Sequence, residues 1–273
     1  MKAPLAIWST YFHELSPEDA VREFKKHGIY AAELSTEHSK VLLARGDAAK
    51  VGKEFGEFLK AEGFTMTQGH LWLGCAFCTY QDHYDGLLDW FVLYDATGVK
   101  NAVLHVDGIR PNEALTVEER LDENARKLNE MAKFIRDNSL DVRICLENLI
   151  RFFGDIDTIN ALMDRLDPDV FGICLDTGHL NLNEDTDQRN FILKAGKRLR
   201  ALHIADNEGR SDQHMMPFGK GNVDFAEIVE ALREINYEGL FNLEIPGENR
   251  VPFEIRKYKL DYIVKCYEYL MKE

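Results

Sequence analysis

The feature of this sequence that most constrains its fold is a regular alternation between short apolar runs and longer segments with helical spacing. The apolar runs number eight and cover residues 4–8, 30–35, 64–70, 101–105, 142–147, 170–176, 199–204 and 240–245. Segments with apolar residues at helical spacing lie between them, among them 17–27, 48–61, 121–137, 156–166, 225–235 and 255–271. Near-continuous apolar runs are typical of parallel strands that are buried on both faces. Eight units of about 34 residues therefore predict an α/β fold, a (β/α)8 TIM barrel.

The same pattern predicts one domain rather than several. No linker rich in Ser, Gly or Pro, no block of like charge and no low-complexity segment interrupts the series, so we expect a single barrel domain over residues 1–273. An open, doubly wound sheet is the alternative fold, but no G-x-G-x-x-G motif follows the first strand. Residues 16–19 read Ser-Pro-Glu-Asp, which is the order expected where a helix begins.

The charge balance narrows the choice of partners. The 273 residues include 47 acidic and 33 basic side chains, which gives a net charge of −14. Such a surface repels phosphate backbones and anionic lipids, so nucleic acid and membranes are disfavoured as partners. The sequence has no apolar run of about 18 residues or more, and its first residues lack the pattern of a signal peptide. Three of the five Cys lie in apolar runs, as reduced core thiols do, so we expect a cytoplasmic protein.

Polar residues occupy an unusual position at the ends of the predicted strands. In a (β/α)8 barrel the active site lies at the carboxyl ends of the strands. At those ends, and in the loop after the seventh strand, the sequence has the motifs Gly69-His70, Leu104-His105, Leu146-Glu147-Asn148, Leu175-Asp176-Thr177-Gly178-His179, Leu202-His203-Ile204-Ala205-Asp206, Asp212-Gln213-His214 and Leu243-Glu244. A single histidine at a strand end is most often a structural residue that is hydrogen-bonded. So many histidines and carboxylates at one mouth form a more specific pattern, and it predicts a functional site there.

Three of these carboxylates are difficult to explain without a cation. Glu147, Asp176 and Glu244 each follow a Leu at the end of an apolar run, and burying an unpaired carboxylate costs several kcal/mol. If they face one cavity, the three also repel one another. A divalent metal held by Glu147, Asp176, His203 and Glu244 removes that repulsion, and this mixture of nitrogen and oxygen ligands suits Zn²⁺, Mn²⁺ or Co²⁺.

Two further motifs each have two interpretations. Cys75-Ala-Phe-Cys78 has the spacing of half a zinc site, but no second pair accompanies it, and a chance CxxC is the better explanation. Gly219-Lys220-Gly221-Asn222 stands before a predicted helix, where backbone N–H groups could cradle a phosphate. The same residues could equally form a tight turn.

Side chains beside the strand ends are candidates for contact with a substrate. Trp8 and Trp72 end or follow predicted strands and could wall a sugar site, although core packing explains them equally well. Arg210 lies seven residues after His203 and could hold a substrate oxygen, or it could be a solvated loop residue. The Glu37-His38 pair after the second strand receives no assignment.

Taken together, these residues resemble the xylose isomerase-like (β/α)8 superfamily, which contains sugar isomerases, ketose 3-epimerases and the endonuclease IV-type AP endonucleases. The segments that carry the resemblance are LEN at 146–148, CLDTGH at 174–179, LHIADN at 202–207, SDQHMMPFGKGNVDF at 211–225 and LEIPGE at 243–248. The resemblance covers nearly the whole chain and is more specific in its second half.

The epimerase branch of this superfamily implies one divalent ion and a pair of glutamates. Its metal ligands match Glu147, Asp176, His203 and Glu244. The glutamates that match Glu147 and Glu244 also form the acid/base pair, and residues that match His179 and Arg210 contact the substrate. Members of the superfamily often pair through exposed helix faces, so the resemblance also implies a homodimer.

The endonuclease branch implies a larger metal cluster. Nine ligands hold three zinc ions there, and this sequence offers a residue for each: His70, His105, Glu147, Asp176, His179, His203, Asp212, His214 and Glu244. The resemblance thus adds further candidate metal ligands to the first four: His70, His105, His179, Asp212 and His214. Typical ketose epimerases lack the histidines that end the third and fourth strands, whereas an Asp-x-His after the seventh also occurs in sugar isomerase-like members.

The loops at the predicted mouth favour a small substrate over DNA. DNA binding needs several Lys or Arg contacts to phosphates. Residues 71–86 and 106–119, after the third and fourth strands, contain one Arg, no Lys and six acidic residues, with aromatic residues that suit a small pocket. The loop after the second strand adds only Lys40 and Arg45. We therefore favour a metal-dependent sugar isomerase or epimerase over an endonuclease IV-like phosphodiester hydrolase that acts at abasic DNA.

The favoured chemistry is proton transfer at the carbon next to the carbonyl of a ketose or keto-sugar. The metal would polarise the carbonyl and stabilise an enediolate, with a base on one face of the carbon and an acid on the other. Glu147 and Glu244, from the fifth and eighth strands, could serve the two faces. The expected partner is a small sugar or sugar phosphate. A metal-free binding module is a third class, and the presence of both glutamates disfavours it.

Overall fold

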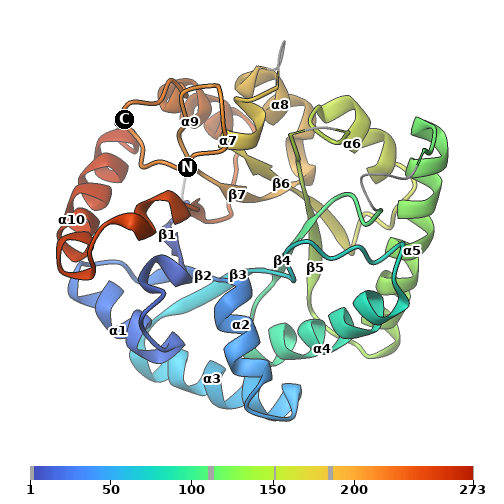
Figure 1. Ribbon diagram of the computed structural model, residues 1–273, viewed down its shortest axis with the longest axis horizontal. Coiled ribbons are helices and arrows are strands. Elements are labelled where there is room, and N and C mark those ends of the chain that lie inside the picture. Colours follow the sequence, from blue (N-terminus) through green and yellow to red (C-terminus); the bar gives the residue numbers. More distant parts are fainter. Residues whose placement is uncertain (1–2, 110–113, 151, 184–186, 273) are drawn as a thin grey trace.

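The barrel consists of short parallel strands arranged in a ring (Figure 1). This computed structural model describes residues 3–109, 114–150, 152–183 and 187–272, and so leaves part of the loop at 106–119 outside the described residues. The strands are β1 Leu5–Trp8, β2 Ala31–Leu34, β3 Thr65–His70, β4 Asn101–His105, β5 Arg143–Glu147, β6 Phe171–Asp176, β7 Leu199–His203 and β8 Phe241–Leu243.

Hydrogen bonds between the last two strands close the ring. The strands pair in the order β7-β6-β5-β4-β3-β2-β1-β8. The strands β7 and β8 stand at the two ends of this order. Between them the N–H of Ile204 donates to the carbonyl oxygen of Asn242 at 2.8 Å, and the N–H of Glu244 donates to the carbonyl oxygen of Ile204 at 3.1 Å. The predicted (β/α)8 barrel is thereby confirmed, and the open doubly wound sheet is excluded.

The helices surround the barrel (Figure 1). They are α1 Pro17–Lys26, α2 Thr36–Leu43, α3 Ala48–Glu62, α4 Gln81–Thr97, α5 Val117–Asp137, α6 Ile156–Met163, α7 Thr177–Leu180, α8 Gln188–Ala195, α9 Phe225–Glu234 and α10 Phe253–Leu270, with the 3₁₀ turns η1 Ser9–Phe12, η2 Gly196–Arg198 and η3 Pro246–Arg250. The six helical ranges named from the sequence correspond to α1, α3, α5, α6, α9 and α10. Within the described residues, no helix has the length and apolar character needed to cross a bilayer.

The two-residue repeat of the strands determines which side chains reach the mouth. A small buried cluster, separate from the main core, consists of Val103, Cys145, Cys174 and Ala201. Their neighbours along the strands, such as Leu104 and Leu146, belong to the main core. The small cluster therefore faces the barrel axis. Two positions after its members stand His105, Glu147, Asp176 and His203. Because alternate residues of a strand point to the same face, these polar side chains also point inward, above an apolar floor.

The eighth strand is shorter than the apolar run 240–245 predicts. It ends at Leu243, and η3 begins at Pro246, so Glu244 lies just beyond the strand. The chain turns there towards η3, yet the N–H of Glu244 still pairs with Ile204. Glu244 thus keeps a fixed backbone position although it is outside the regular strand.

Gly52 on α3 permits a close approach to α4, which a side chain would prevent. A Cβ at this position would lie 2.6 Å from the carbonyl oxygen of Leu93 and 2.8 Å from the Cβ of Ala96. We expect Gly52→Ala to lower the free energy of unfolding by about 1–3 kcal/mol, because overpacking outweighs the better helix propensity of Ala. The matched control is Gly86→Ala on α4, whose Cβ would make ordinary contact with Trp72 at 3.4 Å. Urea denaturation should show unchanged or higher stability for the control, and equal losses in both variants would contradict this explanation.

Candidate metal centre

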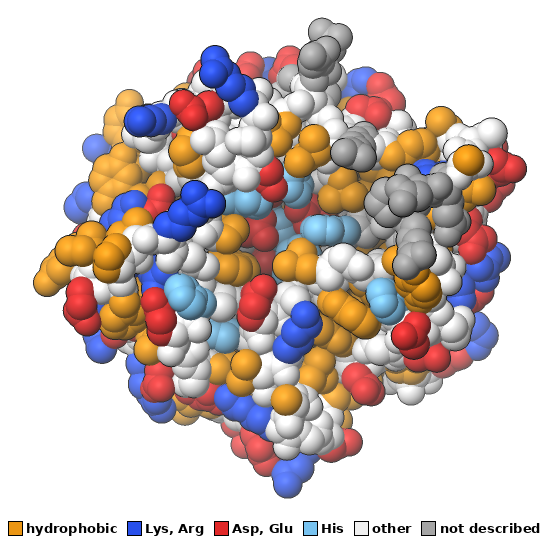
Figure 2. Space-filling model, in the orientation of Figure 1, with side chains coloured by type: hydrophobic (Ala, Val, Ile, Leu, Met, Phe, Trp, Pro, Cys, Tyr) orange, Lys and Arg blue, Asp and Glu red, His pale blue; other side chains and the backbone are white. Residues whose placement is uncertain are grey.

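A cavity of about 300 Å³ lies at the carboxyl ends of the strands. Figure 2 shows histidine and acidic side chains gathered in the hollow near the centre of this face. The described residues that line the cavity include Trp8, Thr36, Glu37, His70, His105, Glu147, His179, Asp212, His214 and Glu244. Most of them are residues that the strand-end pattern singled out.

The four residues predicted to hold the first metal lie together. Their candidate ligand atoms fall within 4.8 Å of one another, and all four are buried: Glu147, Asp176, His203 and Glu244. Nδ1 of His203 lies 3.3 Å from Oε1 of Glu147 and 3.4 Å from Oε2 of Glu244. Oδ1 of Asp176 accepts a hydrogen bond of 2.6 Å from the N–H of His179, which caps α7. The structure brings this set together as expected, while the role of its members as ligands stays a prediction.

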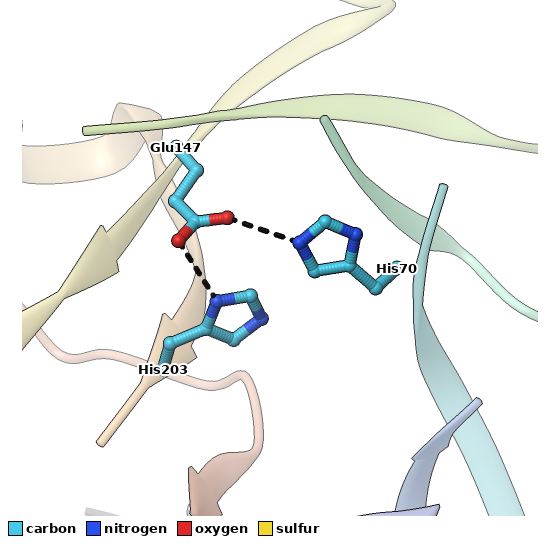
Figure 3. Close-up of side chains that lie close together, drawn as sticks. All are labelled: His70, Glu147 and His203. Atoms are coloured by element: carbon cyan, nitrogen blue, oxygen red, sulfur yellow. Dashed lines mark ion pairs between the residues drawn. The ribbon is translucent and has the colours of Figure 1, made fainter. Parts of the chain in front are cut away.

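A second group shares Glu147 with the first. His70, Glu147 and His203 also have candidate ligand atoms within 4.8 Å of one another. Nε2 of His70 lies 3.3 Å from Oε2 of Glu147, so His70 and His203 approach different oxygens of this carboxylate (Figure 3). His105 stands beside them, with Nε2 at 3.7 Å from the same Oε2. Glu147 is therefore the residue on which the histidines of β3, β4 and β7 converge.

A third group lies next to the first two. Oδ2 of Asp212 is 3.4 Å from Nε2 of His179 and 3.0 Å from Nε2 of His214. Nδ1 of His179 also lies 3.4 Å from Oε1 of Glu147, which joins this group to the others. His214 has a φ of +43°, a left-handed conformation that is uncommon for a residue with a side chain and that clusters at functional sites. The further ligands implied by the resemblance thus gather at the same mouth as the first four.

Each of four histidine rings is oriented by an acceptor that faces one of its two nitrogens. For three rings the acceptor of Nδ1 is a backbone carbonyl: that of Leu71 for His70 (2.8 Å), of Asn148 for His179 (3.0 Å) and of Glu244 for His214 (3.2 Å). For His203 it is the carboxylate of Glu33, 2.8 Å from Nε2. A carbonyl or an ionised carboxylate can only accept, so the nitrogen that faces it carries the proton. The other nitrogen of each ring is left to face the carboxylates of the mouth.

This arrangement leaves buried polar atoms without partners. Within the described chain, Nε2 of His70, Nδ1 of His203, Oε2 of Glu147 and Oδ2 of Asp176 are buried and have no hydrogen bond. Nitrogen lone pairs and carboxylate oxygens that face one another repel unless a proton or a metal ion lies between them. Imidazole nitrogen and carboxylate oxygen are ligands that Zn²⁺, Mn²⁺ and Co²⁺ accept. The residues present therefore fit a divalent ion.

Without an ion, protons held by the histidines and by a carboxyl group neutralise part of the negative charge of the site. Burial lowers the pKa of His179, but the carboxylates of Asp176, Asp212 and Glu147 outweigh burial and raise that pKa to about 12. Burial raises the pKa of Glu244 to about 7, and the charges of Glu147 and Asp176 act in the same direction. Burial would also raise the pKa of Glu147, but the surrounding histidines hold it well below its usual range. The site thus separates the pKa values of two glutamates that are alike in water.

The residues considered for substrate contact lie in different surroundings. Trp8 is buried and lines the cavity. Trp72 is not among the described residues that line it, and its ring packs against that of His83 with the ring centroids 4.5 Å apart. Arg210 is exposed and also lies outside the described lining. Substrate contact stays a prediction for Trp8, Trp72 and Arg210.

Glu37 lines the cavity although its place in the sequence suggested no role. Its Oε2 accepts a hydrogen bond of 2.9 Å from Oγ1 of Thr10. Its position shortly after the end of β2 is the signal that could have identified it. His38 differs, because Nδ1 lies 3.0 Å from Oγ of Ser9 and Nε2 lies 3.2 Å from the carbonyl oxygen of Leu15. We interpret His38 as a buried structural residue.

The CxxC motif does not form a metal site with other described residues. Sγ of Cys75 lies 3.6 Å from the carbonyl oxygen of His83, and Sγ of Cys78 lies 3.8 Å from that of Glu123. Burial raises the pKa of both thiols, that of Cys75 to about 12, so the thiolate form that binds metals is disfavoured. These surroundings agree with a chance CxxC.

The glycine-rich loop before α9 packs against a buried carboxylate. A Cβ on Gly221 would overlap the side chain of Asp206, which is itself buried. The N–H of Val223 donates to Oδ1 of Asp206 at 3.2 Å. Because an anionic group of the chain itself already uses this backbone donor, the tight turn is favoured over a phosphate cradle.

A comparison with known protein families supports the same fold. The family model described as a xylose isomerase-like TIM barrel matches residues 21–265. The chain belongs to this family. The match extends from α1 into α10 and includes the described cavity residues of β3 to β8.

Individual proteins are similar to this xylose isomerase-like barrel to different degrees. An uncharacterized protein of Sinorhizobium fredii is 30% identical over 169 residues, which are 60% of this chain and 53% of that protein. D-psicose 3-epimerase of Enterocloster bolteae is 37% identical over 125 residues, which are 44% of this chain and 38% of that enzyme. The matched segments thus span about half or less of these relatives. The zinc-bound structure of the IolI protein has a similar fold, with a TM-score of 0.75, 17% identity and coverage of 97% of this chain and 96% of that chain.

Removal of metal from this xylose isomerase-like protein should lower its melting temperature. An ion that binds the folded chain alone stabilises it by about 2.7 kcal/mol at a hundredfold excess over its dissociation constant. We expect EDTA-treated protein to regain stability when Mn²⁺, Co²⁺ or Zn²⁺ is added. Asp176→Asn, which replaces a buried candidate ligand by an amide, should lose most of this response. An unchanged melting temperature, together with no bound metal in elemental analysis, would contradict the metal centre.

Proposed function

We propose that the protein is a metal-dependent sugar isomerase or epimerase of the ketose 3-epimerase type. The observation that carries this proposal is the approach of Glu147, from β5, and Glu244, from the end of β8, to one cavity beside Asp176 and His203. The similarity to D-psicose 3-epimerase supports the choice of a sugar substrate. We propose a ketose or keto-sugar, free or phosphorylated, as that substrate. A homodimer in the cytoplasm remains our expectation.

The two glutamates are suited to opposite steps of a proton transfer. A base takes the proton from the carbon beside the carbonyl, and an acid returns a proton to the other face. In the ion-free site the pKa of Glu147 lies well below its usual range and that of Glu244 is about 7, so the two carboxyl groups differ in their affinity for a proton. When bound, a divalent ion would polarise the carbonyl and stabilise the enediolate.

Other residues at the cavity would bind and orient the sugar. His179 directs Nε2 towards Asp212 at the cavity, where it could donate to a sugar oxygen. Trp8 supplies an apolar wall, and the carboxylate of Glu37 can accept hydrogen bonds from hydroxyl groups. We retain Arg210 as a substrate contact from the loop after β7. A cavity of about 300 Å³ lies at the small end of the range for ligand sites, which favours a monosaccharide.

Replacing Glu147 or Glu244 by Gln keeps the shape of the side chain but removes the carboxylate that accepts a proton. General acid–base catalysis contributes about 10²–10⁴-fold, so kcat should fall at least about a hundredfold in each variant at saturating metal. Glu54→Gln, at an exposed position on α3, should keep the wild-type kcat. Solvent deuterium exchange into substrate should persist in each variant for the stereoisomer whose proton faces the intact glutamate. Full turnover by either metal-loaded variant would rule out the paired-carboxylate mechanism.

A second candidate function is supported by the complete set of strand-end residues. The described groups contain eight of the residues that match the endonuclease branch, and His105 lies 3.7 Å from Glu147 beside them. This set would suit a three-metal phosphodiester hydrolase acting at abasic DNA. We rank this function second, because a chain with a net charge of −14 repels a phosphate backbone.

Metal stoichiometry and DNA incision distinguish the two functions. The epimerase proposal predicts one tightly bound ion per chain and no incision of a duplex with an abasic site, even at low salt, where attraction to phosphate is greatest. The substrate screen should use ketoses and keto-sugars, with Glu147→Gln as the inactive control for both assays. Three bound ions together with robust incision that is absent from this control would reverse the ranking.

A further inference from the structure

Glu33 is a buried carboxylate that belongs to none of the metal-ligand groups described above. It stands on β2 and is completely buried. Its Oε2 accepts hydrogen bonds from Nε2 of His203 at 2.8 Å, from Nδ2 of Asn242 at 3.0 Å and from Nε2 of Gln68. The donors come from β7, β8 and β3, so one oxygen joins strands from different parts of the barrel. These hydrogen bonds offset part of the cost of burying the charge, while Oε1 is buried and has no hydrogen bond to the described residues.

The contacts of Glu33 fix its position independently of His203. Nε2 of Gln68 also donates to the carbonyl oxygen of Leu202 at 3.2 Å, so the Gln68 amide is itself held across the barrel. Asn242 is held in turn, because its backbone carbonyl accepts from the N–H of Ile204. Glu33 therefore presents Oε2 to His203 from a rigid support.

The ring of His203 is unusual among the histidines of the mouth in being oriented by a side chain. The rings of His70, His179 and His214 are oriented by backbone carbonyls, as described above. The carboxylate of Glu33 only accepts, so Nε2 of His203 carries the proton and Nδ1 turns its lone pair away from Glu33. Nδ1 then faces Glu147 at 3.3 Å and Glu244. In Figure 3 the remaining nitrogen of the His203 ring points away from Glu147.

We propose that Glu33 is a positioning residue for the metal ion, because it fixes the tautomer and the ring orientation of His203. The inference rests on the proposed function only in that an ion binds at His203. Carboxylates that hold a metal-binding histidine in this way typically change metal affinity by about 10–100-fold when they are removed. If Glu33 served only to satisfy the amides of Gln68 and Asn242, its loss would affect the stability of the fold but not the binding of metal.

The test measures Co²⁺ binding and the visible absorption spectrum of the Co²⁺ complex in the full-length protein. Glu33→Met removes the acceptor, whereas Glu33→Gln keeps an acceptor oxygen of the same reach. The matched control is Gln68→Met, a substitution in the same buried cluster that leaves the Glu33–His203 contact in place. We expect Glu33→Met to bind Co²⁺ about tenfold or more weakly, with an altered spectrum. Glu33→Gln should restore the spectrum and part of the affinity, and Gln68→Met, which removes one support of Glu33 but keeps its carboxylate beside His203, should lower the affinity less than Glu33→Met does.

Several outcomes would overturn the inference. Wild-type affinity and spectrum in Glu33→Met would show that Glu33 does not act through His203, whatever happens to the melting temperature. If Glu33→Met does not fold, Glu33→Asp carries the test, because its shorter side chain keeps the charge but withdraws the acceptor from His203, and an affinity within about twofold of the wild type would overturn the inference. A wild-type protein that binds no Co²⁺ would overturn both this inference and the proposed function. If Co²⁺ binding depends on Glu33 but the protein turns over no sugar, only the proposed function would be overturned.

Discussion

The mutual repulsion of buried carboxylates at the barrel mouth is the constraint on which the rest of the site depends. Glu147, Asp176 and Glu244 are buried, and their candidate ligand atoms lie within 4.8 Å of one another. Like charges in such surroundings cannot all remain ionised unless a positive charge lies among them. Protonated histidines supply that charge in one state and a divalent ion would supply it in another. Protons and metal therefore compete for the same atoms.

The barrel makes this arrangement rigid in two ways. The apolar cluster below the site fixes the direction of the strand-end side chains, because residues two positions apart in a strand share a face. The acceptors behind the histidine rings then decide which nitrogen faces the mouth. Three of these acceptors are backbone carbonyls, which follow from the fold itself, and one is the side chain of Glu33. The geometry of the candidate ligands is thus set by the fold itself.

Membership of the xylose isomerase-like family establishes the fold but leaves the reaction to the residues of the site. The separated pKa values of Glu147 and Glu244 suit the exchange of a proton between two faces of a carbon. The additional histidines and Asp212 suit a larger metal cluster. Both sets share Glu147, and the net negative charge of the chain is the reason for our proposal of a small sugar rather than DNA as substrate.

The periodicity of the sequence predicted the barrel and the residues at its mouth, because strand alternation and strand ends are local properties of the chain. Glu147, Asp176 and His203 could be found in this way. Other assignments required contacts between distant segments. The contact of the Trp72 ring with His83 on α4, for example, could not be read from the strand pattern.

What the sequence by itself determined is the order of the strands and the chemical type of the residues that end them. The tertiary structure decided the partners of these residues and their charge states. Glu33 and His203 are 170 positions apart, so no local pattern could join them. The same holds for the pKa of Glu244, which depends on burial and on charges from other strands. Closure of the barrel brings these groups together, and only in the closed barrel can they form hydrogen bonds and shift one another's pKa values.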